Sequence, residues 1–152
     1  MKRHLIVLSA SLFVAGALAA APVGAPPVEA ATPCVYIYRV YFDSPGSDTG
    51  SNTSLNAEWI KLRNRCSTGK SLTGWKIKDA AGHTYKFGTY TLRAGYTVKV
   101  HTGRGTNTAS NRYWGSGWYI WNNTGDKAIL RRADGTLVDT CTFSGAGDSV
   151  YC

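Results

Sequence analysis

Short segments of alternating apolar and polar residues, separated by turn-forming residues, constrain the fold of this chain more than any other feature. Ile60 and Leu62 alternate with Lys61 and Arg63, and the same period of two recurs in residues 75–78 and 96–101. A period of two is typical of a β-strand with one buried face, and no segment shows a sustained helical period. The sequence therefore predicts an all-β protein.

The expected strands are short and numerous. Residues 43–56 and 102–117 are rich in polar residues and glycine and are expected to be long loops, and Asp134-Gly135 is expected to form a hairpin turn. Many short strands with frequent turns are typical of a β-sandwich. About eight strands are expected, at residues 34–42, 60–63, 75–78, 84–87, 96–101, 118–121, 127–131 and 136–143.

Three phrases, each a strand-like segment joined to a turn, stand out at residues 58–64, 72–77 and 121–130. Their order and spacing resemble the lamin-tail domain family, and the resemblance covers roughly residues 34–143. It implies an immunoglobulin-like β-sandwich in which Gly74 permits a close approach and Gly125-Asp126 turns the chain into the next strand. The implied core residues are Ile60, Leu62, Trp75 and Ile77.

The resemblance also bears on function. This family includes the tails of nuclear lamins, which are thought to contact DNA through this domain, and many exported bacterial proteins. The chain has no coiled-coil rod, so filament assembly is not implied. What the resemblance implies is a compact, non-catalytic interaction module, here in a bacterial secreted form.

The first thirty residues have the pattern of a signal peptide. Lys2-Arg3-His4 precedes an uncharged apolar run at residues 5–21, and Val28-Glu29-Ala30 offers a small-residue cleavage site. A retained membrane anchor is the alternative, but the proline-bearing residues 22–27 favour cleavage. We therefore expect a signal peptide at 1–30, a mature domain at 31–152 that is secreted to the extracellular space, and no transmembrane anchor after cleavage.

An even number of cysteines behind a secretory signal predicts two disulfides in an oxidising compartment. Four cysteines allow three pairings, and the strand layout favours joining the first to the second and the third to the fourth. Zinc is not favoured, because no Cys-x-x-Cys pair is present and His83 and His101 stand alone. No metal or other cofactor is expected. The cysteines are Cys34, Cys66, Cys141 and Cys152.

The expected mature domain is strongly basic. Removing Lys2, Arg3 and Glu29 from 17 basic and 9 acidic residues leaves 15 and 8, a net charge of +7. Such a domain outside the cell attracts polyanions such as nucleic acid or anionic wall polymers. The alternative is that the charge only keeps a small domain soluble.

Several basic residues alternate with expected core positions and so project from the outer faces of their strands. If their strands share one sheet, they form a stripe suited to a polyanion or a surface protein; an ordinary solvated sheet face is the alternative. These residues are Lys61, Arg63, Lys76, Lys78 and Lys99.

An aromatic cluster at residues 113–121 offers a second kind of binding site. Strand alternation predicts that Trp118 and Ile120 are buried and that Tyr119 and Trp121 are half-buried. The expected exposed pair precedes this strand, with two arginines nearby, and suits a carbohydrate-binding module as the alternative function. This group comprises Tyr113, Trp114, Arg104 and Arg112.

No catalytic constellation is evident in the sequence, so the protein is expected not to be an enzyme. His83 and His101 lie beside neither a nucleophile nor a paired carboxylate, and a small hydrolase is kept only as a third alternative. Four carboxylates could furnish a paired-carboxylate or calcium site if the long loop folds over, but residues 43–48 lack the full spacing of ligands in a calcium loop. These are Asp43, Asp48, Glu58 and Asp126.

Overall fold

The computed structural model describes residues 33–152, so the expected signal peptide at 1–30 lies outside the described residues. Within residues 33–152, no helix is long and apolar enough to cross a membrane. Eleven strands and one short helix follow in chain order: β1 (Val35–Tyr41), α1 (Asn52–Ala57), β2 (Trp59–Asn64), β3 (Lys70–Ser71), β4 (Lys76–Lys78), β5 (Thr84–Lys86), β6 (Thr91–Leu92), β7 (Thr97–His101), β8 (Asn111–Tyr113), β9 (Asp126–Arg131), β10 (Leu137–Phe143) and β11 (Ser149–Tyr151).

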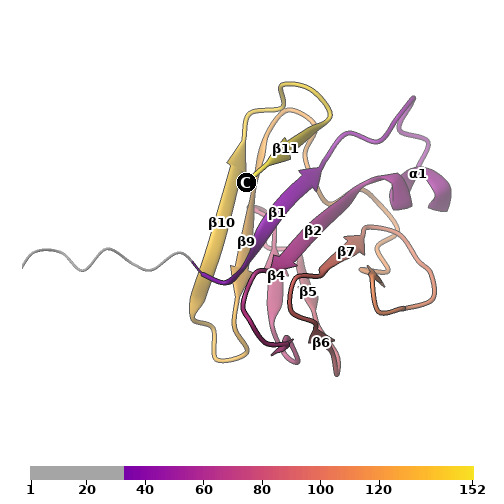
Figure 1. The fold of residues 1–152 in the computed structure, drawn as a ribbon. Coiled ribbons are helices and arrows are strands. Elements are labelled where there is room, and N and C mark those ends of the chain that lie inside the picture. Colours follow the sequence, from indigo (N-terminus) through magenta and orange to yellow (C-terminus); the bar gives the residue numbers. More distant parts are fainter. Residues whose placement is uncertain (1–32) are drawn as a thin grey trace, which may run out of the picture. The chain divides into compact units, whose positions relative to one another are not determined.

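The strands form two main sheets that lie as two layers (Figure 1). A five-stranded sheet has the order β11-β1-β2-β7-β8, and a four-stranded sheet has the order β10-β9-β4-β5. All pairs in them are antiparallel except β7 with β8. The predicted all-β, immunoglobulin-like sandwich is confirmed, with strands β3 and β6 as a small separate pair.

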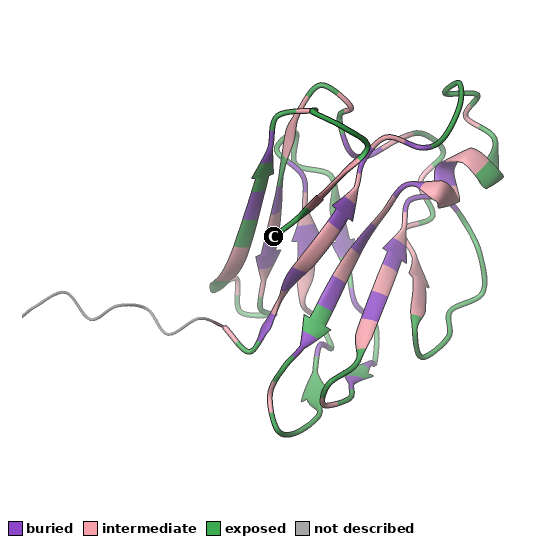
Figure 2. Ribbon diagram, turned by 45° about the horizontal axis from the view of Figure 1, so that its top comes forward, coloured by how far each residue is buried: buried purple, intermediate pink, exposed green. Residues whose placement is uncertain are grey.

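Alternation along the strands builds the core between the layers. Ile60 and Leu62 of β2 and Ile77 of β4 are completely buried, as predicted, and Trp75 packs against them while half-buried. Bands of buried and partly exposed residues follow one another along β1, β2 and β7 (Figure 2). The inner face of each of these strands is therefore apolar, and the side chains of its outer face are accessible to solvent and to a binding partner.

The predicted turns and disulfides are also confirmed. Gly135 has a φ of 91° in the hairpin between β9 and β10. At Gly125, with a φ of 130°, a Cβ atom would lie 2.9 Å from the carbonyl oxygen of Phe143, so a side chain has no room there. The disulfides are Cys34–Cys66, which joins the start of β1 to the end of β2, and Cys141–Cys152, which joins β10 to the residue after β11.

Several segments differ from the sequence-based expectations, including the short pair of β3 and β6, which was not expected. The two expected loops contain helix α1 and strand β8, and a further strand that was not expected, β11, pairs with β1. Residues 118–121 are not a strand, because their backbone groups bond to side chains instead of a neighbouring strand. The Trp118 N–H donates to Ser116 Oγ, and the Ile120 N–H donates to Glu58 Oε1.

Candidate functional site

The predicted basic stripe is divided between the two sheets. Lys61 and Arg63 on β2 and Lys99 on β7 belong to the five-stranded sheet, whereas Lys76 and Lys78 on β4 belong to the four-stranded sheet. The condition for one continuous stripe, that all these strands share a sheet, is therefore not met. Alternation within a strand shows which side chains face outward, but it does not show which sheet the strand joins.

A different basic group is assembled on the outer face of the five-stranded sheet. Arg39 lies directly opposite Lys61 across β1 and β2, and Lys61 lies directly opposite Lys99 across β2 and β7. Neighbouring strands are about 4.8 Å apart, so the three α-carbons span about 10 Å perpendicular to the strands. We call Arg39, Lys61 and Lys99 the cation row.

An irregularity in β1 brings Arg39 into this row. The register of β1 against β2 shifts between Ile37 and Arg39, as in a β-bulge. Tyr38 and Arg39 are consecutive residues, yet both are partly exposed while Ile37 and Val40 on either side are buried. A bulge permits this, because it opposes two residues of one strand to one residue of its partner.

The cation row is electrostatically costly to the folded protein. Like charges directly opposite each other in a sheet are destabilising, and the row contains two such pairs. Burial, followed by repulsion from Lys99 and then from Arg39, lowers the pKa of Lys61. Among residues 33–152 the only ion pair joins His83 to Asp79, so no carboxylate forms an ion pair with the row there.

Beside the cation row lies a row of rings. Tyr41, Trp59, His101 and Tyr113 occupy consecutive opposite positions across β1, β2, β7 and β8, and we call them the aromatic row. The Tyr41 and Trp59 rings stack at 5.4 Å, and the His101 and Tyr113 rings stack at 5.1 Å. The rings therefore face one another across the strands.

The faces of these rings also hold the cations. Lys99 Nζ lies 4.5 Å and Lys61 Nζ 5.0 Å from the centre of the Trp59 ring, and the Arg39 guanidinium carbon lies 4.6 Å from that of Tyr151. Cation–π contacts of this kind position a charge without neutralising it. The same contacts occupy the ring faces on which a planar ligand would have to stack.

Hydrogen bonds fix Arg39 further. Its Nη1 donates to Tyr151 Oη at 3.1 Å and its Nη2 donates to Ser149 Oγ at 2.8 Å. Both acceptors belong to β11, and both are neutral. Arg39 is thus held in place by neutral acceptors, and the Asp148 carboxylate interacts with its charge without forming an ion pair with it.

The remaining predicted binding residues are scattered. Arg112 turns toward the core, with its guanidinium carbon 4.1 Å from the Tyr90 ring centre, and Arg104 is exposed in the loop after β7. Tyr113 faces outward in the aromatic row. The expected exposure of Trp114 is wrong, because its ring is half-buried and packs edge-on against Trp121.

Three residues that belong to the cation row and the aromatic row were not identified from the sequence. Arg39, Tyr41 and Trp59 flank buried positions of β1 and β2, so their alternation with Val40 and Ile60 predicts an outer face. No local pattern indicates that three strands align their cations in one row. That alignment depends on the register of β1, β2 and β7 and on the bulge.

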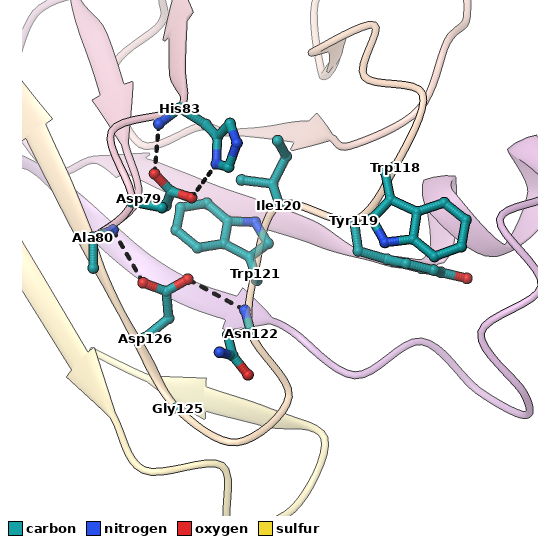
Figure 3. A pocket seen from close by; sticks show the side chains of 11 residues that line it. Asp79, Ala80, His83, Trp118, Tyr119, Ile120, Trp121, Asn122, Gly125 and Asp126 are labelled. Atoms are coloured by element: carbon teal, nitrogen blue, oxygen red, sulfur yellow. Dashed lines mark hydrogen bonds and ion pairs between the residues drawn. The ribbon is translucent and has the colours of Figure 1, made fainter.

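A shallow pocket of about 400 Å³ lies between the β4–β5 turn and residues 118–126 (Figure 3). Its two carboxylates hold turns: Asp79 accepts from the backbone N–H groups of Gly82 and His83, and Asp126 accepts from those of Ala80 and Asn122. The His83 ring contacts Asp79 Oδ2 at 2.5 Å. The carboxylates of Asp79 and Asp126 therefore stabilise the two turns, and their hydrogen-bonding capacity is used by the backbone.

The aromatic residues at this pocket are placed differently from the prediction. Trp118 was expected to be buried but is 61% exposed, and Trp121 was expected to be half-buried but is 2% exposed. The irregular backbone of residues 118–121 removes the alternation on which both expectations depended. Trp118 is consequently an exposed ring at the pocket rim.

Asp43 and Asp48, two of the candidate calcium residues, meet at Asn123. The Asn123 side-chain amide donates to Asp43 Oδ1 at 3.0 Å and to Asp48 Oδ2 at 3.2 Å. Across residues 33–152 no group of three or more histidine, cysteine, aspartate or glutamate side chains is arranged to hold a metal ion. The two carboxylates tie the loop after β1 to the segment before β9.

Within the described part of the chain, Glu58 is the carboxylic residue with no exposure to solvent. Its Oε1 accepts from Thr102 Oγ1 and from the Ile120 N–H, while its Oε2 has no partner among the described residues. Burial raises the pKa of Glu58 to about 7, against the effect of these hydrogen bonds, which lower it. Glu58 therefore joins β2, β7 and the irregular segment 118–121 at one buried point.

Comparison with known proteins agrees with this architecture. A search of curated proteins finds no match. The family model described as Lamin Tail Domain matches residues 29–145, most of the chain. This is a family of immunoglobulin-like domains, in keeping with the two-layered sandwich described above. The chain belongs to the lamin tail domain family.

Proposed function

We propose that this protein is a secreted, non-catalytic module that binds an anionic polymer through the outer face of its five-stranded sheet. The observation that carries the proposal is the cation row. Arg39, Lys61 and Lys99 are aligned at adjacent positions, held by rings and neutral acceptors, and unpaired with any carboxylate among residues 33–152.

The cost of this arrangement supports a binding role. Folded proteins depart from local rules mainly at functional sites, and opposed like charges are such a departure. A polymer with regularly spaced phosphates or carboxylates would relieve the repulsion, and several such contacts together release counterions on binding. Because the ring faces are occupied, the ligand is recognised by its charge and not by stacking of its bases.

The test compares two triple variants of equal charge. R39Q/K61Q/K99Q removes the cation row, whereas K76Q/K78Q/K127Q removes three charges from the four-stranded sheet. Binding of a labelled oligothymidylate would be measured over a salt series. We expect the first variant to reduce the salt slope by about 2 to 3, since each lost phosphate contact removes roughly 0.7 to 0.9, and the second to change it little. Equal losses in both variants would contradict a localised site.

Secretion belongs to the same proposal. The charged start, the apolar run and Val28-Glu29-Ala30 support cleavage before Ala31, and two disulfides suit an oxidising compartment. N-terminal sequencing of the protein from the culture medium of its producer should give a start near Ala31. A membrane-bound form that retains Met1 would contradict it.

A second candidate function is binding of a neutral glycan at Trp118. A Cβ atom at Gly50 would lie 2.6 Å from the Trp118 ring, so Gly50 backs this exposed ring closely. An aromatic ring beside a pocket that also carries polar side chains suits a sugar ring, which offers both an apolar face and hydroxyl groups. W118A should then abolish binding of a neutral oligosaccharide independently of salt, while Y96A, which removes another exposed ring, should not. Retained binding by W118A would exclude this site.

A further inference from the structure

We propose that the Cys141–Cys152 disulfide supports polyanion binding by keeping β11 paired with β1. This pairing holds Arg39 in the cation row, so cleavage of the disulfide weakens binding. The inference rests on the proposed function and adds a redox-sensitive element to it. It concerns only this disulfide and not Cys34–Cys66.

The first step concerns what holds β11. This three-residue strand forms the edge of the five-stranded sheet and pairs with β1 alone. Backbone bonds from Phe42 N to Asp148 O and from Cys152 N to Tyr38 O flank the pairing. Edge strands are the parts of a sheet that open most readily. Through Cys141 the disulfide anchors this edge to β10 of the other sheet.

The second step concerns what β11 does for Arg39. Both of its side-chain acceptors, Tyr151 Oη and Ser149 Oγ, lie on β11, and its guanidinium also lies over the Tyr151 ring. Arg39 meanwhile lies directly opposite Lys61, which repels it. When β11 separates from β1, Arg39 loses these partners while the repulsion remains. Its side chain then leaves the row.

The third step is that the coupling acts in both directions. If the intact disulfide strengthens binding, bound polymer must oppose opening of the disulfide to the same extent. A dithiol reductant such as dithiothreitol cleaves the bond by attack of its thiolate on one sulfur. Cys141 and Cys152 then become thiols, and the reductant, which supplies the two electrons, becomes a cyclic disulfide. Cys152 is exposed, so a reductant can approach it.

The experiment measures the affinity of the full mature chain for labelled oligothymidylate at low salt. We expect Cys141→Ser/Cys152→Ser to bind about fivefold or more weakly, within the usual range of such couplings, and Arg39→Gln to show a similar loss. Adding Arg39→Gln to the disulfide variant should cause little further loss, because both changes remove the same contact. Oligothymidylate should also slow reduction of Cys141–Cys152.

Two further variants make the outcome decisive. S149A/Y151F keeps the disulfide but removes both acceptors of Arg39, so it should also weaken binding even if the disulfide variant fails to fold. C34S/C66S, which alters the other disulfide, should bind like the wild type. Wild-type affinity in folded C141S/C152S, or in S149A/Y151F, would overturn this inference alone. Failure of the wild-type protein to bind any polyanion would overturn the proposed function itself.

Discussion

At the scale of single residues, Glu58 is expected to make the unfolding free energy of this protein depend on pH. The carboxyl group is buried at the junction of β2, β7 and residues 118–121, and burial raises its pKa to about 7. In the unfolded chain the same group titrates near its ordinary value of 4.5. Between these values the folded protein holds a proton that the unfolded chain releases.

The sign of the pH dependence follows directly. The contribution of Glu58 to stability is fully present below about pH 4.5 and is lost as the pH rises through about 7. A difference of this size corresponds to about 3 kcal/mol of unfolding free energy. Chemical denaturation of the wild type at pH 5 and pH 8 should show this loss.

The matched control is E58Q, which keeps the acceptor oxygen for Thr102 and Ile120 but does not titrate. Its unfolding free energy should lack this pH-dependent component, while contributions of other groups remain common to both proteins. The same pH dependence in E58Q and the wild type would show that Glu58 is not the group responsible.

At the scale of elements, the alternation of apolar and polar residues predicted where strands lie better than it predicted which strands pair with one another. Ile60, Leu62 and Ile77 are buried as expected, because the period of two is a local property of the chain. The division of the basic residues between two sheets depends on strand order, which no local pattern contains. Residues 118–121 were mistaken for a strand, because side chains such as Glu58 satisfy their backbone in place of a sheet.

The site illustrates the same limit. Lys61 and Arg63 were predicted to face outward and do so. Tyr113 was expected to be exposed but is only partly so, because its ring stacks on His101 and lies close to Gly105. Arg39 was missed, since its alternation with Val40 indicates only an outer face, and no local pattern indicates the β-bulge and the register that place it opposite Lys61.

Cys34–Cys66 was predictable, because the antiparallel pairing of β1 with β2 brings the start of one strand to the end of the next. Cys141–Cys152 was predictable for another reason, because the two cysteines are only 11 residues apart and close a short C-terminal loop.

The two disulfides should differ in their effect on stability. Replacing Cys34 and Cys66 by serine should cost roughly 2–5 kcal/mol, as is usual for small secreted domains. Cys34–Cys66 closes a separation of 32 residues and Cys141–Cys152 one of 11. The chain-entropy model therefore makes loss of the second about 1 kcal/mol less costly. Denaturant midpoints of both double-serine variants would check this order, and the reverse order would contradict the entropic account.

At the scale of the whole molecule, net charge alone does not define a site. A domain with a charge of +7 attracts any polyanion weakly over its whole surface, so retention on an anionic column carries little information. What distinguishes the five-stranded sheet is arrangement: cations in register, rings beneath them and no carboxylate partner among residues 33–152. The central claim is that binding is localised there.

The most direct test is to map the contact on the folded protein. Isotopically labelled protein spanning residues 31–152 would be titrated with oligothymidylate while the backbone amide signals are followed. We predict that the largest shifts fall on β1, β2, β7 and β11, around Arg39, Lys61 and Lys99, while β4, β9 and β10 change little. Shifts concentrated on β4 and β9, or spread evenly over the basic residues of both sheets, would contradict the account.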